Sequence, residues 1–179
     1  MPDPTRLRAV GFALTAAGAL LAGIGSALVW TTAGLRQDTA GVLDLEVRGL
    51  DEIEGVVTLL VAAVTLALLL LMRRLHGSGR VRGAIGLLVA GMVLVALPVS
   101  VALRAEDLAT QEMARVVART GGLTEQEAIR LVRTDPDLAV RADTSGVWPS
   151  IAGGALVVVG AAIHLAWARQ SEGQFAGNP

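Results

Sequence analysis

Four long stretches without acidic or basic residues constrain the fold of this chain more than any other feature. Crossing about 30 Å of hydrocarbon takes roughly 20 apolar residues in a helix. A surface helix of a soluble protein would instead carry a polar stripe at the 3.6-residue period, and these stretches show none. The sequence therefore predicts four membrane-spanning helices. They run from Ala9 to about Trp30, from Gly55 to Met72, from Gly83 to Leu103 and from about Trp148 to Ala168.

The composition fits a membrane protein. Of the 179 residues, 53% are hydrophobic and 17% are charged, whereas about 25% are charged in a typical soluble domain. The net charge of −1 gives no basic footprint for nucleic acid, and the absence of cysteine excludes disulfides and thiolate metal sites. The first stretch exceeds the roughly 7–15 residues of a signal-peptide core, so we expect it to stay as a span.

The distribution of arginine predicts the orientation. The short loop 73–82 holds four arginines and no acid, whereas the longer loops 31–54 and 104–147 each hold more acids than arginines. Arginine in short loops stays on the cytoplasmic side of the membrane. We therefore expect a multi-pass protein of the plasma membrane with both termini in the cytoplasm and the two acidic loops outside.

The first outer loop carries a strand pattern. Apolar and charged residues alternate from Val42 to Arg48, which is typical of a half-buried strand. The segment Trp30 to Leu35 is a candidate partner strand, joined to it by turn-forming residues at 38–41. A β-hairpin is therefore predicted.

The second outer loop has helical patterns. Residues 106–120 place apolar side chains on one face, and two glycines follow. Thr124 to Glu127 matches a capping box, in which the Thr hydroxyl and the Glu carboxylate each accept an amide at the helix start. Asp135-Pro136 ends that helix, and one more turn could follow up to Val140. The prediction is one domain, residues 1–179: an all-α membrane protein, a four-helix bundle with an extracytoplasmic cap of a hairpin and two or three short helices.

No pattern of catalytic, cofactor-binding or metal-ligating residues emerges. The carboxylates Asp51, Glu52 and Glu54 match no calcium loop, so a solvated surface is favoured over a cation site. His164 is the single ionisable residue within a span, and an interfacial position near the inner headgroups is favoured over a proton relay. The few hydroxyls of the spans are expected to bond to their own helix backbone.

The residues that stand out suggest packing or interfaces. Indole rings prefer the membrane surface, so Trp30 and Trp148 are expected at the outer interface. Small residues four apart in the first span allow close helix contact, within the molecule or between two copies. A proline inside the third span is expected to kink it. The interface or packing candidates are Trp30, Trp148, Pro149, Gly153, Gly154, Gly18, Ala22 and Pro98.

Several local features of the sequence together match the pattern of one family. Trp30-Thr31-Thr32 follows the first span, residues 47–51 precede the second, an arginine-rich turn follows it, and Trp148-Pro149 leads into Gly153-Gly154. In these features the chain resembles the actinobacterial tryptophan-biosynthesis-associated membrane proteins. That resemblance implies four spans and genes near tryptophan genes, but no known activity. The long helical outer loop and the total of three Trp depart from the family.

These features favour a non-enzymatic accessory or scaffold protein that interacts through its outer loops or a bundle face. A subunit of a small-solute transporter or channel is the second interpretation, and the uncharged spans count against it. A membrane enzyme acting on lipid or envelope precursors is the third, and the lack of a paired acid and base in the spans counts against it. The expected partners are the lipid bilayer and either a second copy or another membrane protein; no nucleic acid, cofactor or metal is expected.

Overall fold

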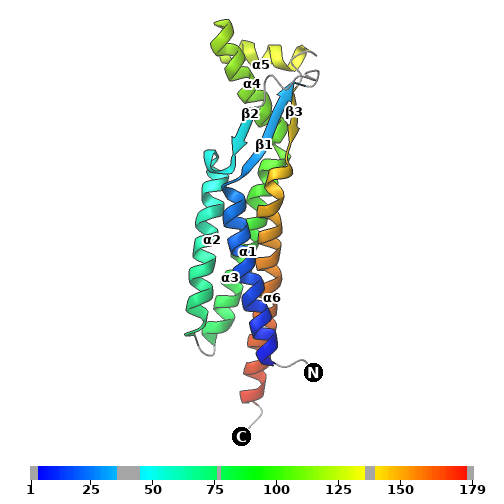
Figure 1. Ribbon diagram of the computed structural model, residues 1–179. Coiled ribbons are helices and arrows are strands. Elements are labelled where there is room, and N and C mark those ends of the chain that lie inside the picture. Colours follow the sequence, from blue (N-terminus) through cyan, green and yellow to red (C-terminus); the bar gives the residue numbers. More distant parts are fainter. Residues whose placement is uncertain (1–3, 36–44, 76–77, 136–139, 177–179) are drawn as a thin grey trace.

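The structure is a computed structural model that describes residues 4–35, 45–75, 78–135 and 140–176. Four long helices pack side by side as a bundle (Figure 1). Each of them is long and apolar enough to cross a membrane, which confirms the predicted bundle. The four helices are α1 (Pro4–Ser26), α2 (Ile53–Met72), α3 (Ser78–Leu103) and α6 (Trp148–Ala176).

The two ends of the bundle differ. Both chain termini and the turn between α2 and α3 lie at one end, and all the remaining elements lie at the other (Figure 1). The first end carries the arginines that follow α2 and begin α3, so we call it the arginine end. We call the elements at the opposite end the cap.

The cap contains a small antiparallel sheet in the order β2-β1-β3. Strands β1 (Val29–Leu35) and β2 (Leu45–Arg48) form the predicted hairpin, which is confirmed. The third strand, β3 (Val140–Asp143), adds to the predicted hairpin, and it begins at the residue up to which the sequence allows one more helical turn. The predicted turn at 38–41, residues 42–44 and residues 136–139 lie outside the described residues.

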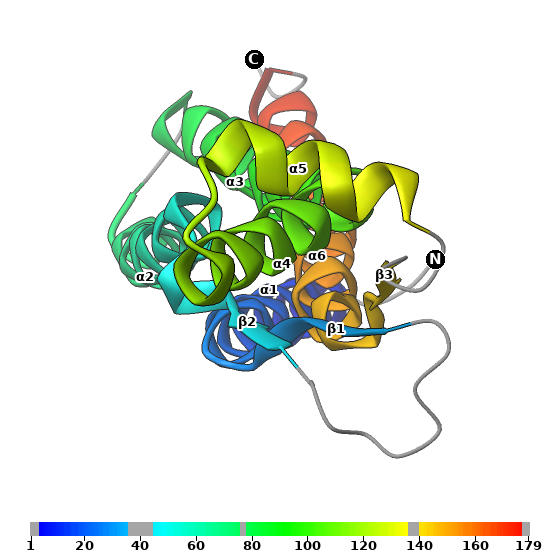
Figure 2. The same cartoon turned by 90° about the horizontal axis from the view of Figure 1, so that it is seen from above.

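Two helices complete the cap and lie over the end of the bundle (Figure 2). Helix α4 (Ala105–Gly121) follows α3 after a single residue, and α5 (Glu125–Thr134) returns beside it. The predicted capping box at Thr124 is confirmed, since its hydroxyl accepts from the Glu127 amide and the Glu127 carboxylate accepts from the Thr124 amide. Gly122, with φ of 65°, provides the left-handed turn between the helices. Their shared core consists of Met113, Ala114, Ala128 and Val132.

The first span differs from its predicted length. Helix α1 ends at Ser26 and the chain enters β1 at Val29, so Trp30 belongs to the sheet. Hydropathy alone could not separate helix from strand here, because the apolar residues continue without a break from one into the other.

The most extensive helix contact in the bundle joins α1 and α6. A Cβ added to Gly18 would lie 2.5 Å from the Gly153 carbonyl oxygen and 2.8 Å from the Val157 amide nitrogen. One added to Gly153 would overlap the backbone of Ala22. In lipid the hydrophobic effect contributes little to helix association, so van der Waals contact between closely packed backbones supplies much of the attraction. Gly18 and Ala22 therefore pack within the molecule.

We predict that Gly18→Ala lowers the free energy of unfolding by about 1–3 kcal/mol, because the added methyl group meets backbone atoms that cannot move aside. Gly23→Ala on the same helix is the matched control, since its Cβ would lie 3.6 Å from Ala62 and Leu59 in ordinary contact. That control should stay within about 1 kcal/mol, on the stabilising side. Reversible unfolding in mixed micelles measures both variants, and equal effects would contradict the assigned α1–α6 contact.

Candidate functional site

Trp30 joins the cap to the bundle. Its side chain is completely buried, and its Nε1 donates a hydrogen bond to the Gly25 carbonyl oxygen at 2.8 Å. Val101 of α3 and Val147 pack with it in one buried cluster. Among the candidates for an interface or for packing, Trp30 is therefore a packing residue, and its ring does not face lipid as expected. The chain turns into β1 just before Trp30, which places the indole beneath the sheet. There the buried cluster contacts the apolar part of the ring, and the Gly25 carbonyl oxygen accepts the bond from its N–H group.

Three glycines allow the backbone to close around this joint. A Cβ on Gly49 would lie 2.6 Å from the Trp30 ring and would overlap the Ser26 carbonyl oxygen. One on Gly146 would overlap the Val29 carbonyl oxygen, and one on Gly55 would overlap the carbonyl of Gly49. Segments far apart in the sequence thus meet with their backbones in contact, which leaves the cap little freedom to tilt on the bundle.

An ion pair at this level of the molecule links α2 to α3. Arg104, directly after α3, pairs with Glu54 in the first turn of α2. The arginine also donates from Nε to the Ser100 carbonyl oxygen at 3.1 Å. This pair ties α2 to α3 at the point where both leave the bundle.

The neighbouring carboxylates do not form a metal site. Asp51 is exposed and Glu54 is paired, while partial burial, followed by the nearby charges of Glu54 and Glu112, raises the pKa of Glu52 above its ordinary value. No group of three His, Cys, Asp or Glu among the described residues is arranged to hold a metal ion. The charges of this region therefore act as a surface, not as a ligand set.

A cleft of about 400 Å³ opens where α3 passes into α4, with β3 on its other side. Two exposed carboxylates, Glu106 and Asp107, come from the first turn of α4. Arg133 of α5 approaches Asp107 at 3.5 Å and offsets its charge, which leaves the negative charge of Glu106 among the lining residues. It can therefore accept a cationic group. The lining residues are Ala102, Leu103, Ala105, Glu106, Asp107, Ala142 and Thr144.

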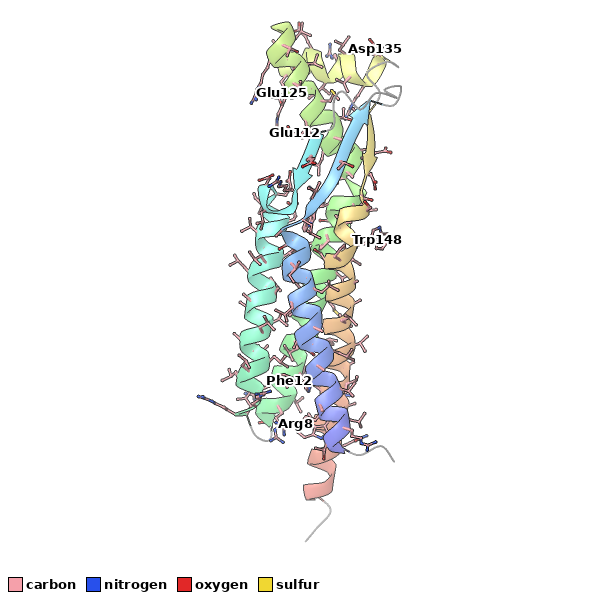
Figure 3. The ribbon with its side chains drawn as sticks, viewed as in Figure 1. Arg8, Phe12, Glu112, Glu125, Asp135 and Trp148 are labelled. Atoms are coloured by element: carbon pink, nitrogen blue, oxygen red, sulfur yellow. The ribbon has the colours of Figure 1, made fainter. Side chains whose placement is uncertain are left out.

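Charged pairs also brace the two cap helices. Glu112 of α4 and Glu125 of α5 lie on the same side of the cap (Figure 3). Arg115 pairs with Glu112 and approaches Glu125 at 3.8 Å. These exposed pairs add little stability individually, and they leave Glu106 in the cleft without a recorded ion pair among the described residues, whereas Glu112, Glu125 and Asp107 each have an arginine nearby.

In α6 the Ser150 hydroxyl donates to the Ala22 carbonyl oxygen of α1 at 3.4 Å, whereas five other hydroxyls of the spans bond to their own helices, as predicted. Each of these five donates to a carbonyl oxygen three or four residues earlier, at 2.6–2.9 Å. Within the described residues they therefore offer no row of free donors along the bundle. The residues are Thr15, Ser26, Thr58, Thr65 and Ser100.

The other candidates from the sequence occupy separate places. Trp148 is 63% exposed at the end of α6 nearest the cap (Figure 3). Pro149 lies against Gly25 of α1, and Gly154 lies against Leu94 and Val95 of α3. Pro98 is buried within α3.

His164 is 5% exposed and buried among the helices at the arginine end. The sequence favoured an interfacial position near the inner headgroups; the ring is instead covered by the protein and packs toward Gly11 of α1. Sequence reasoning could not find this position, since it depends on which face of α6 meets α1.

The four apolar helices and the polar cap define a helical membrane-embedded protein. A scan against protein-family models found no match, and a search of the curated proteins found none either.

We predict that Trp30→Phe loosens the cap. The variant loses the Nε1 bond and leaves space beneath the sheet, at a cost of about 1–3 kcal/mol. Hydrogen–deuterium exchange should accelerate in β1 and β2. The matched control Trp148→Phe removes an exposed indole and should change stability by no more than about 0.5 kcal/mol. Unchanged exchange in Trp30→Phe would contradict the role of this residue as the joint.

Proposed function

We propose that this chain is a non-enzymatic accessory or scaffold protein of the plasma membrane, and that its cleft docks a basic segment of another membrane protein. The observation that carries the proposal is the pair of exposed carboxylates, Glu106 and Asp107, in an open cleft at the foot of the cap. A cleft with a surplus of carboxylates favours Lys or Arg side chains.

The height of the cleft supports a membrane-protein partner. Leu103, the last residue of α3, lines the cleft and is 82% exposed, and the carboxylates follow within one turn. Apolar span and acidic surface thus meet at this point. Basic residues beside a span of a neighbouring protein would lie at the same depth.

The orientation of the protein is part of the proposal. The termini and the arginine-rich turn share one end, and the acidic cap forms the other (Figure 1). The positive-inside rule then puts the arginine end in the cytoplasm and the cap outside. A rigid joint suits a scaffold, because a docked partner would be held at a fixed angle to the membrane.

Specific contacts favour the scaffold over a transporter subunit and over a membrane enzyme. A transporter subunit needs polar groups along a path, and the hydroxyls recorded in the spans donate to backbone carbonyl oxygens of their own helix or, for Ser150, of α1. An enzyme needs convergent acid and base groups, whereas Glu54 is paired with Arg104 and Asp51 points its charge to solvent. Kinship with the tryptophan-associated membrane proteins stays a prediction and would add no activity.

A photo-crosslinking amino acid tests the docking site. Placed at Thr144 in the cleft, it should give one heteromeric product in native membranes, and placed at Arg119 near the far end of α4 it should not. The double variant Glu106→Gln with Asp107→Asn should reduce the product about tenfold, because lost charge-assisted hydrogen bonds weaken the complex by at least that factor.

Glu125→Gln is the matched control, since it removes an exposed cap acid outside the cleft and should leave the product unchanged. A product that contains only a second copy of this chain, or equal products from both positions, would contradict the proposal.

A further inference from the structure

The arginine end of the bundle contains a pocket that the proposed scaffold role does not use. Helix α1 contributes Arg8 and Phe12, which lie at this end (Figure 3), and α6 contributes His164 and Trp167. Arg73 follows α2 and Arg80 belongs to the first turn of α3. The enclosed space is about 20 Å³, which is room for about one water molecule or one oxygen atom of a larger group.

The guanidinium groups of this pocket are held by aromatic rings. The Cζ atoms of Arg8 and Arg80 lie 5.3 and 5.0 Å from the ring centre of Trp167, and that of Arg73 lies 4.3 Å from the centre of Phe12. A guanidinium stacked on a ring keeps its N–H edge available for planar oxygen groups.

These arginines differ from three arginines of the cap. Among the described residues none of the three forms an ion pair with a carboxylate, whereas Arg104, Arg115 and Arg133 of the cap all do. Arg80 uses its Nε on the Leu75 carbonyl oxygen, which fixes the side chain in place. Three positive charges are therefore gathered at one point without an anion from the described part of the chain.

His164 provides an independent sign of a ligand. It is 95% buried, its ring lines the pocket, and its Nε2 has no hydrogen-bond partner in the described structure. A buried polar atom without a partner is costly, and in native proteins such an atom commonly meets a water or a bound ion.

We infer that this pocket binds a phosphate group, with the guanidinium groups of Arg8, Arg73 and Arg80 on its oxygens. His164 meets one of those oxygens, or the water beneath it, through Nε2. Stacked arginines are suited to phosphate because two parallel N–H groups match two oxygens. The phosphate can belong to the headgroup of an anionic phospholipid or to a soluble phosphate compound. A pocket where apolar helices end in arginines lies at headgroup depth, where anionic lipids are bound.

The test uses the purified full-length protein in micelles and native mass spectrometry. Phosphatidylglycerol, phosphatidylcholine and inorganic phosphate are titrated separately. We expect one phosphatidylglycerol or one phosphate ion to bind at least about tenfold more tightly than phosphatidylcholine. Preference for phosphatidylglycerol would identify a lipid headgroup, and preference for phosphate would identify a soluble source. Failure of both to exceed phosphatidylcholine would overturn the inference.

Matched arginine variants separate the pocket from general surface charge. Arg80→Ala should weaken binding about tenfold, whereas Arg82→Ala, two residues away and exposed outside the pocket, should change it by less than about twofold. Arg80→Lys keeps the charge but loses the planar fork, so it should still weaken binding. An equal loss of binding in Arg80→Ala and Arg82→Ala would show that the ligand is attracted by any nearby cation, and it would overturn the inference.

A spectroscopic signal needs no substitution in the pocket. In protein labelled with ¹⁵N-histidine, the preferred ligand should shift the His164 resonance, and His76→Gln assigns it by removing the other histidine signal. An unmoved His164 resonance at saturating ligand would contradict the place given to its Nε2. Because the scaffold proposal concerns the opposite end, loss of cap crosslinking leaves these results unaffected, and the reverse also holds.

Discussion

Hydrocarbon cannot supply hydrogen bonds, and the structure of this protein follows from that constraint. Backbone amides inside a bilayer must pair within the chain, so the apolar stretches become helices. The hydroxyls of Thr15, Thr58 and Thr65 obey the same rule by bonding to carbonyls of their own helix. Between helices, where lipid removes most of the hydrophobic drive, backbone contact takes its place, and Gly18 against Gly153 is the clearest case.

At each end of the bundle the chain leaves the apolar helices, and its polar groups no longer have to bond within one helix. The two ends differ in how their charged side chains are arranged. At the cap end the chain builds a sheet and two helices over Trp30, and Arg104, Arg115 and Arg133 pair with acids. At the other end the arginines stack on aromatic rings and have no carboxylate partner among the described residues. One end thus carries exposed acids on its cap, and the other carries a cluster of ring-stacked arginines.

The features predicted well from sequence are those set by local patterns. The four helices follow from the lengths of the apolar stretches, the β1–β2 hairpin from alternation, and the capping box from the Thr124 to Glu127 spacing. These depend on neighbouring residues, so a single sequence contains the necessary information.

The features that escaped prediction depend on contacts between distant segments. The burial of Trp30 requires Val101 and Val147 to meet it, and β3 exists because residues 140–143 reach the edge of β1. The cleft likewise needs β3 beside the start of α4, and the pocket at His164 needs residues of four helices, α1, α2, α3 and α6, at the same level of the bundle. Hydropathy reports how apolar a helix is, but not which of its faces meets which neighbour. For this reason the outer acids could be noticed in the sequence, whereas their shared cleft could not.

The central claim is that the bundle separates an outer cap from a cytoplasmic arginine end, and introduced cysteines test it directly, because the chain has none of its own. A membrane-impermeant maleimide should label Arg119→Cys in intact cells, label Arg82→Cys only after permeabilisation, and leave Leu60→Cys unlabelled in both. Leu60 is 60% exposed on the lipid-facing side of α2, so burial in the protein would not protect it. Labelling of Leu60→Cys as fast as Arg119→Cys, or of Arg82→Cys in intact cells, would contradict the account.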